Sequence, residues 1–197
     1  MPPSGTGGNT EYADTRTAFD DLPDDLKHEL LEKDYIACHS LYHSRKVLIQ
    51  ARIFTSSRKG TKAHKPQTAA PGFLDSINPS EHFMSRHKLL QRHDPSGRLN
   101  LYIASHVHHI EGLSPTDSQR LIDTLYAHVC APKYTVSVPW LHDGDLILWD
   151  NTCVMHRATG GSYDGKYVRD MRRATVHDGS GQAWGLNERN GDRMGFP

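Results

Sequence analysis

Residues near the C-terminal end of the chain have types and a spacing that could do chemistry. Residues 149–151 read Trp-Asp-Asn, His156 follows, and Arg169 and Arg173 come thirteen and seventeen residues after the histidine. A strand that ends at His156, with the two arginines four apart on a neighbouring strand, would place a metal-binding imidazole beside a cation that can hold a carboxylate. The pattern therefore predicts part of a metal centre with an anion-binding edge.

These residue types also have ordinary structural explanations. His156 could be a core histidine, and Arg169 could be a solvated charge on a basic strand. Trp140 and Trp149 fit a hydrophobic core better than a substrate contact. The surrounding sequence has to decide between the two interpretations.

Composition limits the classes of protein that fit. The chain has 197 residues, enough for one domain with a buried core, and its 23 basic residues balance its 23 acidic ones. A balanced charge gives no reason to expect a nucleic-acid partner. No run of eighteen apolar residues is present, and residues 1–5 do not resemble a signal peptide. We expect a cytoplasmic protein without a membrane partner, and self-association into a homo-oligomer stays open.

Residues that could bind metals are numerous. Fourteen histidines are a high count for this length, and most of them are expected at the surface or in structural positions. The three cysteines, Cys38, Cys130 and Cys153, are widely spaced and odd in number, which fits neither a disulfide framework nor a zinc ribbon. We expect reduced and mostly buried thiols.

The N-terminal half contains helix and strand signals around a loop. Residues 14–21 predict a short helix, and Pro23 suits the first position of a second one. Residues 47–55 alternate as in a strand, and residues 56–72, rich in Lys, Pro, Ser and Ala, predict a loop. Helical spacing predicts that the second helix buries three leucines: Leu26, Leu30 and Leu31.

The C-terminal half predicts one helix among several strands. Residues 94–97 are a turn signal before the apolar run 99–105, which predicts a strand pair. Ser114 caps a helix that begins at Pro115 and ends near Pro132. The buried stripe of this helix should contain Leu121, Ile122, Leu125, Tyr126 and Val129. Four later segments are typical of strands: 134–140, 145–150, 152–155 and 166–176.

Together these elements predict a mainly β fold with peripheral helices. A jelly roll or double-stranded β-helix, here partial, fits the pattern, although other antiparallel barrels share it. We expect a single domain over residues 1–197, with residues 177–197 as a flexible tail.

Three blocks of the sequence carry a family resemblance. Residues 7–14 read Gly-Gly-Asn-Thr-Glu-Tyr-Ala-Asp, and residues 92–106 give a partial match. The third and most specific block, residues 144–175, contains Gly-Asp-Leu, Trp-Asp-Asn, His-Arg-Ala and Arg-Arg-Ala-Thr in that order. The chain resembles the TauD/TfdA family of iron(II)- and 2-oxoglutarate-dependent dioxygenases, in particular its chlorophenoxyacetate-degrading branch.

The resemblance implies roles for four residues. His156 would be the distal ligand of Fe(II), and Thr10 and Arg169 would bind the distal carboxylate of 2-oxoglutarate. Arg173 would lie nearby and meet the anionic group of the substrate or support the cosubstrate. Such an enzyme uses O2 to hydroxylate a small anionic organic substrate while 2-oxoglutarate is decarboxylated to succinate. Thr10 could instead be only a β-forming or turn residue.

One part of the family pattern is missing. The family places a His-x-Asp/Glu pair on a strand before the Thr10 block, but only nine residues precede Thr10 here, so we expect that the N-terminal strands are missing. The nearest local match, His109-Ile110-Glu111, comes after that block. His106 and His108 could also bind a metal as an alternating pair, but a polar strand end explains them better.

Two hypotheses of different classes follow. The first is a dioxygenase of the TauD/TfdA type, of which the chain is an incomplete part. The second is a truncated, catalytically silent homologue that keeps part of the barrel for binding or interaction. A zinc module built on residues 106–109 is a third and weaker hypothesis.

Overall fold

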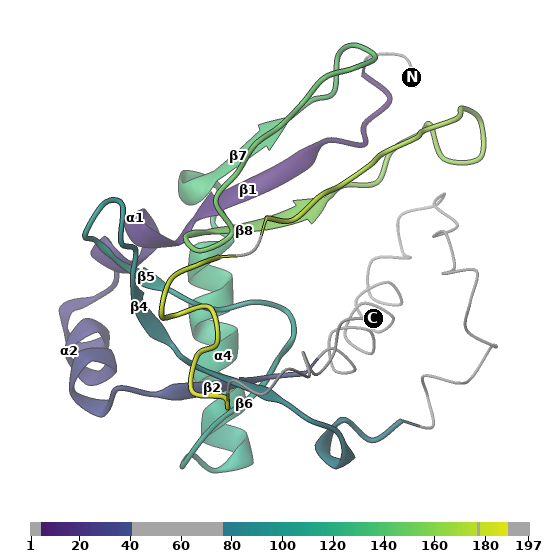
Figure 1. The fold of residues 1–197 in the computed structure, drawn as a ribbon. Coiled ribbons are helices and arrows are strands. Elements are labelled where there is room, and N and C mark those ends of the chain that lie inside the picture. The colour runs from purple at the N-terminus through teal and green to yellow at the C-terminus, as the bar shows by residue number, and fades with distance from the viewer. Residues whose placement is uncertain (1–4, 41–76, 177, 189–197) are drawn as a thin grey trace.

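The computed structural model describes residues 5–40, 77–176 and 178–188. Within these ranges the chain forms short strands in three small antiparallel sheets, with helices beside them (Figure 1). The strands are β1 (Thr10–Asp14), β2 (Ile36–His39), β3 (Ser85–Lys88), β4 (Leu90–Arg92), β5 (Leu99–Leu101), β6 (Val107–Ile110), β7 (Thr135–Val138) and β8 (Val154–Ala158). The helices are α1 (Thr15–Asp20), α2 (Asp24–Lys33) and α4 (Pro115–Val129), with 3-10 turns at Pro79–Glu81 and Pro132–Tyr134. The strand expected at 47–55 and the loop expected at 56–72 lie outside the described residues.

The sheets join segments that are far apart in the sequence. Their strand orders are β7-β1-β8, β3-β2-β6 and β4-β5. In the first sheet β1, near the start of the chain, lies between two strands from the last third (Figure 1). The β4-β5 pair confirms the strand pair expected around the turn at residues 94–97.

The two N-terminal helices form where the sequence predicts them. Asp14 caps α1, because its carboxylate accepts a hydrogen bond from the Arg16 backbone N–H. Pro23 precedes the first residue of α2 as its N-cap, and this helix buries Leu30. The expectation for Leu31 is wrong, since it is 54% exposed. Successive helical residues point about 100° apart, so a helix that buries a narrow stripe leaves the next leucine in water.

Helix α4 confirms the strongest helix signal. The Ser114 hydroxyl accepts a hydrogen bond from the Asp117 N–H at 3.1 Å, and the helix packs beside β6. The Ser118 hydroxyl accepts from the Ile110 N–H of β6 at 2.8 Å and ties the two elements together. The helix ends at Val129, three residues before Pro132, because a 3-10 turn begins at that proline. Its buried residues include Leu121, Ile122, Leu125 and Val129, with Tyr126 partly buried.

The core lies between α4, α1, α2 and the central strands. It combines apolar side chains from these elements with two of the cysteines, Cys38 and Cys153, while Cys130 is half-buried. All three thiols are unpaired with one another, as expected. Its largest fully buried apolar side chains are Leu30, Leu89, Leu101, Val107, Ile110, Leu125 and Val129.

Two of the expected strands do not form. Residues 145–150 and 166–176 alternate in sequence, but the described part of the chain has no strand at either place. Leu148 and Val168 are 87% and 86% exposed. A strand needs a neighbour to accept its backbone hydrogen bonds, and within the described ranges neither segment has one. Arg169 and Arg173 therefore lie on an irregular segment and not on a strand.

Residues 178–188 return to the strands β3 and β4. Leu186 N–H donates to the Arg86 carbonyl at 2.9 Å, and the Gln182 side chain donates to the Arg92 carbonyl at 2.7 Å. A flexible tail over 177–197 stays a prediction. Within the described ranges, no helix has the length and apolar character that crossing a membrane requires.

Candidate active site on strands β1 and β8

The pairing of β1 with β8 brings together residues from opposite ends of the sequence. Tyr12 lies opposite His156, and Thr10 lies opposite Ala158. Because side chains alternate along a strand, Thr10, Tyr12 and His156 share one face of the sheet. Thr10 and His156 are diagonal neighbours, which places their Cα atoms roughly 7–8 Å apart. Two of the four predicted site residues are therefore close together.

Aromatic rings flank the His156 imidazole. The ring centroids of Trp149 and Tyr12 lie 5.0 Å and 6.3 Å from that of His156. These rings shield part of an otherwise exposed side chain, and this desolvation, together with the positive charge of Arg173, lowers the pKa of His156 below its ordinary value. The lowered pKa favours the neutral imidazole, which is the form that binds a metal ion.

Thr10 is buried beneath a tryptophan. Its hydroxyl accepts a hydrogen bond from Trp140 Nε1 at 3.3 Å, and the residue is 6% exposed. Trp140 and Trp149 thus both contact residues of this face, although the sequence favoured a purely structural role for them. A threonine hydroxyl that accepts one hydrogen bond can still donate its own proton to a carboxylate.

Arg169 lies against the segment that leads into β1. Its guanidinium donates to the Gly8 carbonyl at 2.7 Å and to Tyr163 Oη at 2.9 Å, and its carbon lies 5.3 Å from the centroid of the Tyr163 ring. These contacts fix Arg169 beside a residue only two positions before Thr10. Arg173 is exposed and close enough to His156 for its charge to act on the imidazole. All four predicted site residues therefore gather around the β1–β8 pair.

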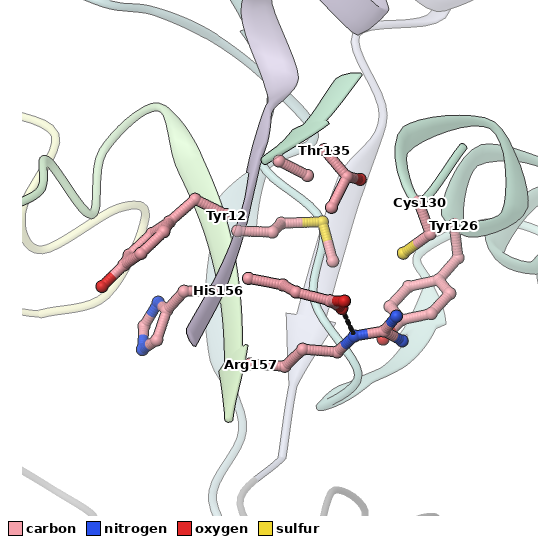
Figure 2. Close-up of a pocket in the computed structure, with 9 residues that line it drawn as sticks. Tyr12, Tyr126, Cys130, Thr135, His156 and Arg157 are labelled. Atoms are coloured by element: carbon pink, nitrogen blue, oxygen red, sulfur yellow. Dashed lines mark hydrogen bonds and ion pairs between the residues drawn. The ribbon is translucent and has the colours of Figure 1, made fainter. Parts of the chain in front are cut away.

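The opposite face of the same strands is a different environment. Arg157 donates to the Glu11 carboxylate there, and Figure 2 shows Tyr12 and His156 pointing away from Arg157. A small cavity of about 30 Å³ lies beside this ion pair and is also lined by Tyr126. Its volume suits a water molecule and not an organic substrate.

A complete iron site would need further ligands at His156. Among the described residues, the one group of three potential ligands with atoms close enough to share a metal ion is His93, Asp150 and Cys153, and it does not include His156. The described residues thus supply one ligand of an iron centre, His156, and not a complete ligand set.

The replacement pair suggested by the sequence is engaged in other contacts. Glu111 forms an ion pair with Arg86 and accepts a hydrogen bond from the Cys38 thiol at 3.3 Å. The ring of His109 lies against that of His108, with their Nδ1 atoms 2.9 Å apart. In the described chain these residues form no group of three metal ligands, and neither does the histidine stretch 106–109 that suggested a zinc module.

Two residues of the site went unnoticed in the sequence. Tyr12 pairs with His156 through strand register, and Tyr163 positions Arg169. The alternation of Thr10 and Tyr12 was a signal for the first of these. No local pattern indicated Tyr163, because its contact with Arg169 depends on the path of an irregular segment.

Comparison with known proteins decides the family. A model described as "Taurine catabolism dioxygenase TauD, TfdA family" matches residues 1–175. The chain belongs to this family. Iron(II) and 2-oxoglutarate, expected from the resemblance, are confirmed as requirements of TauD/TfdA enzymes.

Two curated TauD/TfdA relatives show how much of such a protein the chain spans. The alpha-ketoglutarate-dependent 2,4-dichlorophenoxyacetate dioxygenase of Burkholderia sp. (strain RASC) is 37% identical over 176 residues, which cover 89% of this chain and 50% of that protein. The (S)-phenoxypropionate/alpha-ketoglutarate-dioxygenase of Sphingobium herbicidovorans is 35% identical over 153 residues, or 78% and 47% of the two chains. The chain spans about half the length of the curated relatives that it matches.

Solved structures confirm the fold class. The crystal structure of AAD-2 in complex with Mn(II) and N-oxalylglycine aligns with a TM-score of 0.65 at 32% identity, over 87% of this chain and 58% of that one. A taurine dioxygenase from Burkholderia xenovorans aligns with a TM-score of 0.57 at 20% identity, over 84% and 45% of the two chains. The mainly β, jelly-roll expectation is therefore correct.

Proposed function

We propose that the face of β1 and β8 that carries His156 belongs to the iron(II) and 2-oxoglutarate site of a dioxygenase that hydroxylates a small anionic organic substrate. The observation that carries this proposal is the convergence on one strand pair of Thr10, His156 and the guanidinium of Arg169. Thr10 and His156 are diagonal neighbours on the two strands, and the Arg169 guanidinium donates a hydrogen bond to the Gly8 carbonyl. An imidazole and a fixed cation beside the same strand pair suit a metal-bound dicarboxylate.

Each residue has a role that its chemistry supports. Iron(II) with bound 2-oxoglutarate would supply the oxidising chemistry. His156 would provide one ligand nitrogen, and Arg169 with Thr10 would bind the distal carboxylate of the cosubstrate and orient it. The positive charge of the exposed Arg173 lowers the pKa of His156, so Arg173 lies near the imidazole. We therefore assign Arg173 to the anionic group of the substrate.

An anionic substrate agrees with the relatives. The names of two of them specify 2,4-dichlorophenoxyacetate and (S)-phenoxypropionate, which are both carboxylates. An arginine beside a metal site would select such compounds through a charge-assisted hydrogen bond.

The first test is the binding of 2-oxoglutarate, measured by anaerobic titration calorimetry with Mn(II) present. We expect Arg169→Ala to weaken binding by about tenfold to a hundredfold, because hydrogen bonds to a charged group contribute about 1.5–3 kcal/mol. Arg172→Ala is the matched control, since Arg172 is an exposed arginine of the same segment that pairs with Asp170. Tyr163→Phe removes an internal contact of Arg169 but keeps the guanidinium. Unchanged affinity in folded Arg169→Ala would refute the assignment.

Turnover is a separate question. Because the described residues gather only one ligand at His156, we expect little or no succinate from the chain by itself. A succinate assay with 2,4-dichlorophenoxyacetate measures this directly. Robust production that survives Glu111→Gln and stops in His156→Ala would show that ligands outside the described residues complete the site.

A binding protein without catalysis is the second candidate. The exposed apolar side chains of Leu146 and Leu148, 81% and 87% exposed, favour it, because large exposed apolar groups mark surfaces that other chains cover. If the chain neither binds 2-oxoglutarate nor forms succinate, this alternative replaces the first.

A further inference from the structure

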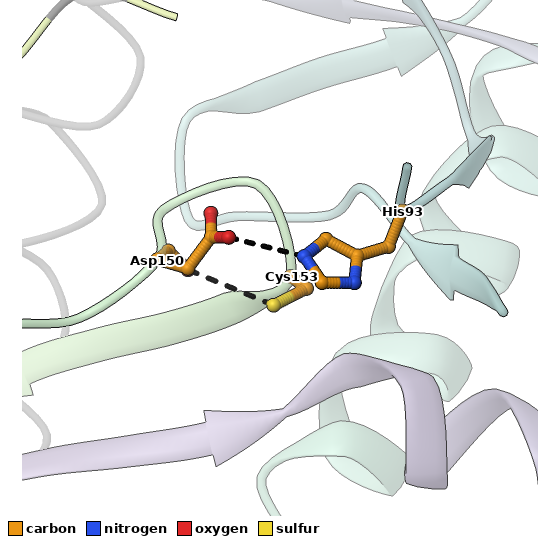
Figure 3. A group of neighbouring side chains, drawn as sticks. All are labelled: His93, Asp150 and Cys153. Atoms are coloured by element: carbon orange, nitrogen blue, oxygen red, sulfur yellow. Dashed lines mark hydrogen bonds and ion pairs between the residues drawn. The ribbon is translucent and has the colours of Figure 1, made fainter. Parts of the chain in front are cut away.

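A second group of potential metal ligands lies apart from His156. His93 follows β4, Asp150 lies in the loop before β8, and Cys153 directly precedes β8. One nitrogen, one oxygen and one sulfur atom of these side chains all lie within 4.8 Å of one another, and Figure 3 shows them converging. Two segments that are far apart in the sequence, the turn after β4 and the turn before β8, thus present three different ligand types to one point.

The group is buried on one side and open on the other. His93 and Cys153 are 6% and 3% exposed, whereas the Asp150 side chain is 47% exposed. A cleft of about 820 Å³ is lined by His93, Asp150 and Asn151 among others. An ion could therefore enter from the cleft and meet ligands that the protein has already ordered.

The oxygen ligand is already oriented. Asp150 Oδ1 accepts hydrogen bonds from the Thr152 N–H at 2.8 Å and from the Thr152 hydroxyl at 2.6 Å. Its other oxygen, Oδ2, is thereby turned toward His93, where it lies 3.0 Å from Nε2. A carboxylate whose second oxygen is held by hydrogen bonds is the usual arrangement at a metal site.

The nitrogen ligand has a suitable outer partner as well. His93 Nδ1 lies 2.7 Å from the Ser96 hydroxyl oxygen and 3.4 Å from the Arg16 guanidinium, which can only donate, so without an ion Nδ1 accepts and the Nε2–H donates to Asp150. Binding of an ion would move the ring proton to Nδ1, where Ser96 can accept it, and free Nε2 as the ligand. Metal-binding histidines commonly have their second ring nitrogen anchored in this way.

Arg16 is the positive charge that faces this group. Its guanidinium lies 3.4 Å from His93 Nδ1, and Asp14 pairs with it at 3.0 Å, which offsets its charge. Burial raises the pKa of the Cys153 thiol; the charge of Arg16 opposes this effect, while the charges of Asp150 and Asp14 add to it.

We propose that His93 Nε2, Asp150 Oδ2 and Cys153 Sγ form a second metal site, which binds a divalent zinc ion. Mixed nitrogen, oxygen and sulfur ligands suit zinc, and three protein ligands leave a fourth position for water or an added ligand. Tetrahedral zinc holds its ligand atoms roughly 3.3–3.8 Å apart, so the present separations need adjustments of only about an ångström.

The proton balance of binding is simple. Binding moves the His93 ring proton from Nε2, where it is donated to Asp150, to Nδ1, where Ser96 accepts it, so this step releases no proton. Asp150 is already ionised, because hydrogen bonds from Thr152 and His93 lower its pKa despite desolvation. The Cys153 thiol loses its proton to the solvent, so one proton is released for each zinc ion bound.

This site is independent of the proposed iron site. Cys153 and His156 are three residues apart at the start of β8, which corresponds to about 10 Å along an extended strand. Zinc would link the turn after β4 to the start of β8 and hold both in place. Its presence requires neither 2-oxoglutarate nor His156.

The test is titration of the untagged apo-protein with Co(II), followed by competition with Zn(II). Co(II) bound to a thiolate gives a near-ultraviolet charge-transfer band, which separates this site from the many histidines of the chain. We expect one equivalent to produce the band, Zn(II) to abolish it, and Cys153→Ser to eliminate it. His93→Gln and Asp150→Asn should each weaken Co(II) binding at least tenfold. His156→Ala should leave the titration unchanged, which distinguishes failure of this proposal from failure of the proposed function.

The matched control is Cys130→Ser, because Cys130 is a half-buried thiol at the end of α4, away from the group. This variant should keep the band. Mass spectrometry of alkylated protein provides a second measurement on the unaltered chain, in which Zn(II) should protect Cys153 and leave Cys130 unprotected. A band that persists in Cys153→Ser, or alkylation of Cys153 that Zn(II) does not slow, would overturn the proposal.

Discussion

The histidine side chains of this protein differ in their surroundings. His156 is flanked by Trp149 and Tyr12 and stands on a strand face that also carries Thr10, which is the environment on which its proposed role as a metal ligand rests. His93 is held by Asp150 and Ser96 on its two ring nitrogens. Local sequence could not separate these cases, because the same residue type serves both and only the neighbours differ.

His39 represents a third environment and leads to a pH prediction. It is 5% exposed, and within the described chain neither of its ring nitrogens has a hydrogen-bond partner. Burial, with smaller contributions from the charges of His106 and His87, lowers its pKa from 6.5 to about 3. Between these two values the unfolded chain takes up a proton that the folded chain does not, so stability falls as the pH falls.

Because of the buried His39, we expect the unfolding free energy to be lower at pH 5 than at pH 7 by on the order of 2 kcal/mol, since a difference of one pKa unit corresponds to about 1.4 kcal/mol. Urea unfolding at both pH values measures this difference. His39→Leu should reduce the pH dependence, whereas His28→Gln should leave it intact, because the His28 side chain is 83% exposed. A pH dependence identical in wild type and His39→Leu would contradict the prediction.

At the scale of elements, α4 provides the clearest relation between sequence and packing. Its Ser114 cap and its apolar stripe both occur as the 3.6-residue period requires, and Leu125 is fully buried at the centre of that stripe. Helix α2 has a similar signal but is shorter and buries less, so its Leu31 stays in water. Periodicity predicts the helix, while the core decides how wide a stripe it buries.

We expect Leu125→Ala to lower the unfolding free energy by about 2–5 kcal/mol, because it leaves a cavity in the core. Leu31→Ala is the matched control and should change it by less than about 0.5 kcal/mol, since Leu31 is 54% exposed. Chemical denaturation followed by circular dichroism checks both variants. Equal effects of the two substitutions would mean that the helices are not packed as described.

Across the whole molecule, the proposed site depends on contact between the segment before β1 and the segment after β8. Gly7 forms an isolated bridge with Gly161, and the Gly8 N–H donates to the Gly160 carbonyl at 3.2 Å. A Cβ at Gly161 would collide with the Thr6 carbonyl and approach the Gly7 Cα to 2.9 Å. This close approach brings Arg169 to Gly8 and hence to the start of β1.

We therefore expect Gly161→Ala to destabilise the protein by about 1–3 kcal/mol, because the backbones must separate. It should also weaken 2-oxoglutarate binding if Arg169 acts as proposed. Gly179→Ala is the control, since a Cβ there would meet no atom within 4 Å. Thermal unfolding and calorimetry report the two effects separately, and a Gly161→Ala variant as stable as Gly179→Ala would show that the bridge is unimportant.

The sequence by itself determined the local elements and the family. The cap and stripe of α4 and the turn before β5 are short-range patterns whose physics lies within a few residues, and the structure confirms them. The block around His156 indicated the family correctly, while the roles of its residues stay predictions. The strands expected at 145–150 and 166–176 failed for the opposite reason. A strand depends on a partner elsewhere in the chain, and alternation cannot show whether one is present.

Only the tertiary structure decided which residues meet. The β1–β8 register set Tyr12 opposite His156, the irregular segment after β8 brought Arg169 to Gly8, and the packing of two distant turns placed His93 beside Asp150 and Cys153. Each of these contacts spans more than fifty residues, apart from that between Asp150 and Cys153. The sequence fixes the chemistry of each side chain. The distances between residues far apart in the sequence arise from packing of the whole chain, and a local pattern of apolar and polar residues does not contain that information.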